Sequence, residues 1–236
     1  MNLEIKPIGI IGAMDNEIEL LKNSMEIRMM ESIAGMTYYC GTLCGKEAVL
    51  VRCGVGKVNA AICAQLLITH FGVGRIINTG VAGSLDREIN IGDLVVSTDA
   101  VQHDMDCQSL GYARGIIPDN EFSVFPADEA MRRSAVESAR IAAPEKRVYE
   151  GRVASGDQFI ADNARKQAII KEHGAICCEM EGAAIGQVCA QNRVPFVIIR
   201  AISDKADNSG HLSYRSFVQA AARHSAAIVK HMAENA

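Results

Sequence analysis

Residues 195–204 read PFVIIRAISD, and this stretch decides the fold class. It is a continuous apolar run, interrupted only by Arg200, that ends in Ser203 and Asp204. Strands that are apolar on both faces are typical of a sheet that helices cover on both sides. The stretch therefore predicts a buried strand of an α/β protein, followed at its carboxyl end by a carboxylate.

Apolar and amphipathic segments alternate along the rest of the chain. We expect further strands over residues 7–13, 75–78, 93–100 and 147–155, and a hairpin of 36–41 and 47–53 that turns at Gly45-Lys46. We expect helices over residues 15–21, 57–71, 127–142, 162–173, 182–192 and 213–233. The residues at 15 and 16, Asp and Asn, offer N-cap chemistry for the first helix. Because a hairpin adds antiparallel strands, the pattern predicts a three-layer αβα fold with a mixed central sheet.

Length and composition narrow the class of protein. The 236 residues predict a single domain over 1–236, because no Pro/Ser-rich linker or long charge run divides them. The net charge of -4 argues against nucleic acid and anionic membranes as partners and favours a small neutral or cationic ligand. No apolar run approaches the roughly 20 residues that cross a bilayer, and the N-terminus lacks a signal-peptide cleavage site. We expect a cytoplasmic protein.

Cysteine usage and one histidine segment bear on metal binding. Cys40 and Cys44 form a C-x3-C pair without a second pair at zinc-ligand spacing, and most of the eight cysteines lie in apolar runs. We expect reduced thiols that pack as small apolar residues. The segment His103-Asp104-Met105-Asp106 carries metal-binding residue types, but one His and two acids on an alternating segment are more typical of a hydrogen-bonded interface. No metal is expected.

Four apolar runs end in polar or glycine-rich residues, and three of the four supply carboxylates. They are followed by Glu17, by Thr79-Gly80-Val81-Ala82-Gly83-Ser84, which reads as a turn, by Glu179-Met180-Glu181, and by Ser203-Asp204. In open α/β sheets, ligands bind at the carboxyl ends of strands. The sequence therefore predicts a carboxylate-rich pocket suited to acid and base catalysis and to binding of hydroxyl pairs.

Each carboxylate also has a purely structural interpretation. Glu17 lies in the first turn of a helix, where an acid interacts favourably with the helix dipole. Glu179 and Glu181 form a charge pair before another helix, and Asp204 suits a turn or a cap. Their joint position after three separate strands favours the functional interpretation.

Residues 54–59, GVGKVN, resemble two nucleotide-binding motifs without matching either. The sixth position of the dinucleotide fingerprint is Asn59, and no acid follows about 20 residues later. For a P-loop, Val51 stands where the first Gly belongs and Val58 where Ser or Thr belongs. We expect neither nucleotide cofactor.

Six motifs together resemble a known family. GIIGAMDNE, GVGKVNA, INTGVAG, SGDQFI, CCEMEG and RAISDKAD, in this order, are similar to bacterial 5′-methylthioadenosine/S-adenosylhomocysteine nucleosidases of the purine nucleoside and uridine phosphorylase superfamily. The resemblance extends from about residue 7 to 230. It implies a nucleoside phosphorylase-like fold and a homodimeric hydrolase of methionine salvage. Such an enzyme releases adenine from 5′-thio-substituted adenosines and uses no cofactor.

The resemblance also implies roles for individual residues. Glu17 matches the carboxylate that activates the attacking water, Asp204 the acid that protonates adenine at N7, and Glu181 the residue that holds the ribose 2′- and 3′-hydroxyls. The implied substrate-binding residues include Met180 at the sugar, Phe159 and Ile160 at the adenine, Gly83 as a backbone contact, and Ala13, Met14, Val55 and Tyr214. Leu110 and Pro118 match positions that cover the 5′-pocket of the neighbouring subunit, which gives the long irregular span 104–126 a role.

The chemistry of the bond agrees with these roles. Cleavage of an N-glycosidic bond needs an acid for the departing base and a base for the water on the opposite side of the sugar. Asp204 donates a proton near neutral pH only if burial raises its pKa. A phosphorolytic enzyme needs Arg and N–H groups around phosphate, so Glu17 at the nucleophile position favours water. Arg200, inside an apolar run, is expected to be the charge partner of a carboxylate rather than a phosphate ligand.

Departures from the family leave alternatives open. Val81 stands where many members have Ser, Leu110 replaces a frequent Phe, and Tyr214 stands where an aromatic often flanks the ribose. Relatives with such 5′-pockets accept 6-amino-6-deoxyfutalosine, so that substrate stays an alternative. A purine nucleoside phosphorylase of the same fold and a catalytically silent nucleoside-binding module are the other two.

Overall fold

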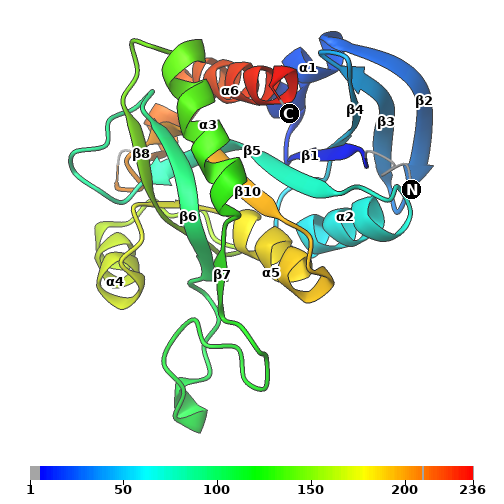
Figure 1. Ribbon diagram of the computed structural model, residues 1–236. Helices are drawn as coiled ribbons and strands as arrows, with labels where there is room; N and C mark the ends of the chain where they lie inside the picture. The colour runs from blue at the N-terminus through cyan, green and yellow to red at the C-terminus, as the bar shows by residue number, and fades with distance from the viewer. Residues whose placement is uncertain (1–5, 209, 236) are drawn as a thin grey trace.

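A ten-stranded mixed sheet forms the centre of the protein, which the computed structural model describes over residues 6–208 and 210–235 (Figure 1). The main path through the sheet runs β10-β6-β8-β9-β5-β1-β4-β3-β2, and β7 pairs with β6. The strands are β1 (Ile8–Gly12), β2 (Met25–Ile33), β3 (Met36–Leu43), β4 (Lys46–Arg52), β5 (Arg75–Ser84), β6 (Leu94–Gln102), β7 (Val124–Pro126), β8 (Val148–Ser155), β9 (Cys177–Glu179) and β10 (Phe196–Asp204).

Helices lie on both faces of the sheet. Figure 1 shows α1, α3 and α6 on one side and α2, α4 and α5 on the other. Their bounds are α1 (Asp15–Asn23), α2 (Lys57–Thr69), α3 (Glu129–Ala142), α4 (Asn163–His173), α5 (Gly182–Asn192) and α6 (Gly210–Glu234). The predicted three-layer arrangement with a mixed sheet is confirmed. None of the described helices is long and apolar enough to span a membrane.

Half of the sheet closes on itself, which the sequence did not predict. Strand β10 pairs in parallel with β5 and antiparallel with β6, while β6, β8 and β9 pair in parallel in that order. Strand β9 then pairs antiparallel with β5 and completes a ring of five strands. The ring brings the carboxyl ends of β5, β8 and β10 close to one another.

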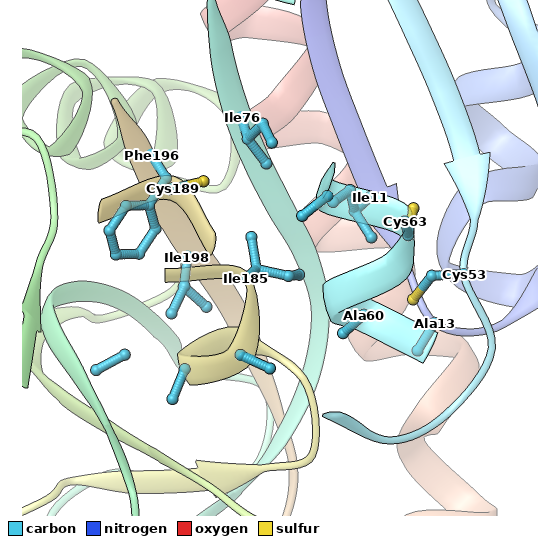
Figure 2. Packing of buried hydrophobic residues seen from close by; sticks show 14 of the residues in the cluster. Ile11, Ala13, Cys53, Ala60, Cys63, Ile76, Ile185, Cys189, Phe196 and Ile198 are labelled. Atoms are coloured by element: carbon cyan, nitrogen blue, oxygen red, sulfur yellow. The ribbon is translucent and has the colours of Figure 1, made fainter. Parts of the chain in front are cut away.

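Buried aliphatic side chains and thiols join the sheet to α2 and α5. Figure 2 shows Ile11 with Cys63 of α2 on one side of β5, and Ile185 of α5 with Ile198 on the other. All four side chains are fully buried. Burial of each large aliphatic side chain stabilises the fold by about 1.5–3 kcal/mol. Five of the eight free cysteines are buried, which confirms their predicted packing role: Cys53, Cys63, Cys177, Cys178 and Cys189.

The glycine-rich segment 79–84 is not the predicted turn. Strand β5 continues through it to Ser84, and all of these residues are buried. The two glycines make room for side chains instead. A Cβ on Gly80 would collide with the Glu17 carboxylate, and one on Gly83 would lie 2.7 Å from Asp204 Oδ1. Strand β10 likewise extends to Asp204, so the acid ends the strand rather than following it.

Three smaller expectations need correction. The N-cap of α1 is Met14 rather than Asp15 or Asn16. The backbone N–H of Met14 donates to the carboxylate of Glu17 at 3.0 Å. The predicted strand list omits β9 and also β2, an edge strand whose residues are mostly exposed, although residues 25–29 (MEIRM) alternate between apolar and polar. The hairpin of β3 and β4 is confirmed, but its turn lies at Cys44 and Gly45, both at positive φ, one residue before the predicted Gly45-Lys46.

The span 104–126 is irregular, as predicted. It contains only a short 3-10 helix at Gln108–Leu110 and the three-residue strand β7. In Figure 1 most of this span extends below the body of the protein as a long loop.

Candidate active site

A cavity of about 240 Å³ lies where the carboxyl ends of β1, β4, β5 and β10 meet. Its lining includes ten of the thirteen site residues predicted from the sequence. They are Ala13, Met14, Glu17, Val55, Gly83, Phe159, Met180, Glu181, Asp204 and Tyr214. Segments that lie at or follow the ends of six strands, together with the helices α1 and α6, are thus brought to a single pocket.

The carboxylate of Glu17 is fixed by backbone N–H groups from two strands. Its Oε2 accepts the N–H of Ala13 at 2.7 Å, and its Oε1 accepts the N–H of Val81 at 3.0 Å. The side chain is buried, and this burial raises its pKa above the ordinary value, although Arg200 and the three N–H donors act in the opposite direction. The Glu17 carboxylate therefore has a fixed orientation and a raised pKa.

Asp204 occupies the end of β10, next to Gly83. Its Oδ1 accepts the N–H of Ala206 at 2.8 Å, and its Oδ2 accepts the hydroxyl of Ser203 at 3.0 Å. Only 2% of the residue is exposed, and burial raises the pKa of its carboxyl despite these two donors. Burial therefore shifts the pKa of Asp204 upward, which is the direction that protonation near neutral pH requires.

Glu181 lies just before α5 with its carboxyl group in the cavity. Its Oε1 accepts the N–H of Gly56 at 2.8 Å. Burial, and then the nearby charge of Glu179, raise the pKa of Glu181 to about 8. The carboxyl thus sits in a site poor in donors, with an unfilled capacity to accept hydrogen bonds from hydroxyl groups.

A buried ion pair adjoins the pocket, because one of its two residues, Glu179, lines the cavity. Arg200 Nη2 lies 2.5 Å from Glu179 Oε2 and also donates to the side-chain oxygen of Asn78. The same Glu179 accepts the hydroxyl of Ser155 and the N–H of Gly182. The prediction that Arg200 is the partner of a carboxylate is confirmed.

Aromatic and thioether side chains form one wall of the cavity. The hydroxyl of Tyr214 lies 3.1 Å from Met14 Sδ, and the ring of Phe159 packs edge to face on Tyr214 with centroids 5.6 Å apart. These residues come from the N-cap of α1, from α6 and from the segment after β8. They give the pocket an apolar side.

Three predicted site residues do not line this cavity. Ile160 is buried in a small apolar cluster beside it, behind Phe159. Leu110 and Pro118 belong to the long loop of 104–126, and Leu110 is 72% exposed. No residue that the structure describes in this loop lines the cavity.

The sequence assigned no individual role to five further residues of the cavity lining. Val81, Ala82, Cys178, Glu179 and Ser203 line the cavity as well. Ser203 and Glu179 adjoin predicted residues in the sequence, so adjacency to a strand-end acid was the available signal. The pairing of Glu179 with Arg200 joins residues 21 positions apart and has no local signature.

A larger cavity, of about 720 Å³, lies elsewhere, between residues 120–129 and the end of α5. Its carboxylates belong to the exposed or half-exposed Glu121, Asp128 and Glu129. The smaller cavity instead gathers four buried carboxyl groups, those of Glu17, Glu179, Glu181 and Asp204. Because perturbed, buried titratable groups cluster at reactive sites, the smaller cavity is the candidate active site.

No group of three His, Cys, Asp or Glu side chains in the described residues is arranged to hold a metal ion. In the segment that starts at His103, the ring of His103 is buried and Asp104 pairs with Lys57. The two acids of the segment, Asp104 and Asp106, are hydrogen-bonded as expected. The ring nitrogens of His103 do not follow this expectation, because neither has a hydrogen-bond partner among the described residues.

The sequence model of the phosphorylase superfamily matches residues 7–234. This chain belongs to the phosphorylase superfamily. Among superfamily members it is 40% identical over 226 residues to a 5′-methylthioadenosine/S-adenosylhomocysteine nucleosidase of Anoxybacillus flavithermus, with 95% of this chain and 97% of the relative covered. The resemblance stated from the six motifs is confirmed.

Solved structures of superfamily members agree with the fold. The nucleosidase of Neisseria meningitidis in complex with methylthio-immucillin-A has a TM-score of 0.93 and 38% identity, covering 98% of this chain and all of that one. A futalosine hydrolase of Helicobacter pylori also has a TM-score of 0.93, with 32% identity and coverage of 98% and 99%. The nucleoside phosphorylase-like fold is confirmed.

Proposed function

We propose that this protein hydrolyses the N-glycosidic bond of 5′-methylthioadenosine and S-adenosylhomocysteine and releases adenine. The observation that carries the proposal is the placement of Glu17 and Asp204, two buried carboxyl groups with raised pKa, on one small cavity. Nucleosidases for these two substrates are among its relatives at about 40% identity.

Asp204 acts as the acid in this proposal. The departing adenine is a poor anionic leaving group, so a proton must reach it as the bond breaks. The buried carboxyl of Asp204, whose pKa is raised by burial, carries that proton in the proposed reaction and donates it to N7 of the base. Ser203 and the N–H of Ala206 fix the orientation of the carboxyl.

Glu17 and Glu181 act on the other side of the sugar. Glu17 orients and deprotonates the attacking water, and its raised pKa strengthens it as a base. Glu181 accepts the 2′- and 3′-hydroxyls of ribose, with Gly56 N–H holding the carboxyl in place. A water between the Glu17 carboxylate and the sugar gives the arrangement of an inverting glycosidase.

Water rather than phosphate suits this pocket as the nucleophile. In the described part of the chain, no Arg or Lys side chain lines the cavity. Arg200 is fully buried and committed to Glu179 and Asn78. A phosphate dianion beside Glu17 would face a carboxylate without a cation to offset the repulsion.

The test is adenine release in phosphate-free buffer. We expect free adenine and 5-methylthioribose from 5′-methylthioadenosine without phosphate, at a rate that added phosphate does not increase. Release that requires phosphate, with a sugar 1-phosphate as product, would establish the phosphorylase instead. Binding without release of adenine under either condition would establish the silent binding module.

The similarity to a futalosine hydrolase favours one second candidate, 6-amino-6-deoxyfutalosine as a substrate of the same site. Turnover of 5′-methylthioadenosine, S-adenosylhomocysteine, 5′-deoxyadenosine and 6-amino-6-deoxyfutalosine, measured side by side, ranks the candidates. We expect the two sulfur-containing substrates to have the highest kcat/KM.

We also propose that the enzyme is a cytoplasmic homodimer of methionine salvage. The loop of 104–126 presents the apolar side chains of Leu110, Tyr112, Ile116 and Phe122 outside its own subunit, and α2 presents Val58 and Ile62. Apolar surface of this kind is typical of a subunit interface. The eight free thiols fit a reducing compartment. Sedimentation equilibrium checks the dimer, and L110A should lower kcat/KM for substrates with large 5′-groups more than for 5′-deoxyadenosine.

A further inference from the structure

Three segments that build the pocket or its surroundings meet just outside it. Residues 54–57 connect β4 to α2, residues 156–160 follow β8, and residues 103–107 begin the long loop after β6. The first supplies Val55 to the cavity and the second supplies Phe159. Pocket shape therefore depends on how these segments are held relative to one another.

A closed cycle of hydrogen bonds joins the three segments through Lys57, Asp104 and Asp157. The backbone N–H of Lys57 donates to Asp157 Oδ1 at 2.8 Å, and the backbone N–H of Asp157 donates to Asp104 Oδ2 at 2.9 Å. The ammonium of Lys57 then donates to Asp104 Oδ1 at 2.6 Å and to Gln102 at 2.9 Å. We call these three residues the Lys57 clasp.

The central ion pair of the clasp is well shielded from water. The Lys57 side chain is 18% exposed and that of Asp104 is 14% exposed. Burial by itself raises the pKa of Asp104, but the hydrogen bonds from Lys57 and Asp157 outweigh it and lower the pKa. Because the pair is partly desolvated and bonded on both carboxylate oxygens, it holds its geometry better than an exposed ion pair does.

The clasp is directly continuous with groups that face the cavity. Gly56, next to Lys57, donates its N–H to the ribose-binding candidate Glu181. A Cβ on Gly56, which has φ of +101°, would lie 3.0 Å from Asp157 Oδ1, so the two segments are in close contact. Phe159 follows Asp157 by two residues. A change in the clasp therefore displaces the Glu181 side and the Phe159 side of the pocket together.

We propose that the Lys57 clasp positions the nucleoside-binding walls of this enzyme, and that Lys57 and Asp104 are positioning residues for adenine and ribose. The clasp touches neither Glu17 nor Asp204, so it acts on substrate binding rather than on proton transfer. The inference rests on the proposed function for its choice of ligand.

Substitutions of Lys57 and Asp104 can remove single interactions of the clasp. K57M keeps the unbranched side chain as far as Cε but removes the ammonium group, so Asp104 loses its cation. In D104N the amide has one acceptor where the carboxylate has two, so one of the donors from Lys57 and Asp157 loses its partner. R152M is the matched control, because Arg152 forms a comparable half-buried ion pair with Asp99 on β6, away from the cavity lining.

The experiment measures steady-state kinetics with 5′-methylthioadenosine and direct binding of adenine by calorimetry, together with thermal unfolding. We expect K57M and D104N each to raise KM and the Kd for adenine about tenfold, with kcat within about threefold of wild type. K57R, which keeps a cation beside Asp104, should have KM and Kd values between those of K57M and wild type. The K57M/D104N double variant should have a KM and a Kd for adenine no higher than those of the weaker-binding single variant, because each substitution breaks the same cycle of hydrogen bonds. R152M should lower Tm without changing KM.

Other outcomes overturn the inference. A lowered Tm with unchanged KM and Kd in K57M, as in the control, would make the clasp a purely structural feature. Additive effects in the double variant would show that Lys57 and Asp104 act separately. If K57M does not fold, D104N and K57R decide by the same criteria. Absence of turnover in the wild type would refute the proposed hydrolase alone, since adenine binding still tests the clasp.

Discussion

Glu17 and Val81 are joined by a hydrogen bond of 3.0 Å from the backbone N–H of Val81 to Glu17 Oε1. Glu17 comes from the start of α1 and Val81 from the middle of β5, so the bond fixes the proposed base against a neighbouring strand. Because the donor is a backbone group, the contact is independent of the side chain at position 81. The substitution of Val for the frequent Ser leaves it intact.

Replacement of Glu17 by Gln should abolish most turnover. The amide keeps the size of the side chain but cannot take a proton from water, so kcat should fall about 10²- to 10⁴-fold. D204N should have an effect of the same order, because an amide cannot donate the acid proton to the base. Single-turnover release of adenine measures both, and adenine binding by calorimetry should stay within a few-fold of wild type. Turnover near wild type in both variants would refute the assigned roles.

Gly83→Ala should lower kcat by crowding the acid. The added Cβ would lie 2.7 Å from Asp204 Oδ1 and must displace a carboxyl that is buried and hydrogen-bonded. A displacement of this size costs up to about 10²-fold in rate. G9A is the control, since its Cβ meets only aliphatic side chains at 3.2 Å or more. A G83A enzyme with normal kcat would show that Asp204 tolerates movement.

Arg200→Met should destabilise the protein strongly. The variant leaves the buried Glu179 carboxylate without its cation, and loss of one partner of a buried ion pair costs about 3–5 kcal/mol. Arg133 on α3 forms an exposed pair with Glu129, so R133M should cost no more than about 0.5 kcal/mol. Urea unfolding of the three proteins measures the difference. Equal stability of R200M and R133M would contradict the structural role of Arg200.

The free protein should lose stability as the pH rises toward 8. The folded-state pKa of Glu181 is about 8, above its ordinary value of 4.5. Between these values the folded protein holds a proton that the unfolded chain has released, so this contribution is full below about pH 4.5 and is lost as the pH rises through 8. Unfolding midpoints in urea should be lower at about pH 9 than at about pH 6.

E181Q should reduce this pH dependence, because an amide does not titrate. Part of the decrease in stability with pH should remain in E181Q, because the pKa values of Glu17 and Asp204 are also raised. The control is E137Q, which removes an exposed carboxylate on α3 and should leave the slope unchanged. An E181Q slope equal to that of wild type would mean that Glu181 is ionised throughout this range.

Local patterns predicted most of the elements but not their ends. The apolar run 195–202 specified a buried strand because apolar side chains on both faces need cover on both sides. Residues 79–84 misled the prediction, because glycine marks close approach as often as it marks a turn, and here Glu17 and Asp204 occupy the space beside Gly80 and Gly83. Strand β2 was missed since an edge strand exposed to water carries no burial pattern.

The sequence by itself determined the α/β class, the strand ends that carry Glu17, Glu181 and Asp204, and the family, because these depend on residue type and order along the chain. Only the tertiary structure decided the closure of five strands into a ring, the pairing of Glu179 with Arg200, and the clasp of Lys57, Asp104 and Asp157. These contacts join residues far apart in sequence. Their hydrogen bonds and pKa shifts depend on burial, which is a property of the packed chain and not of any local segment.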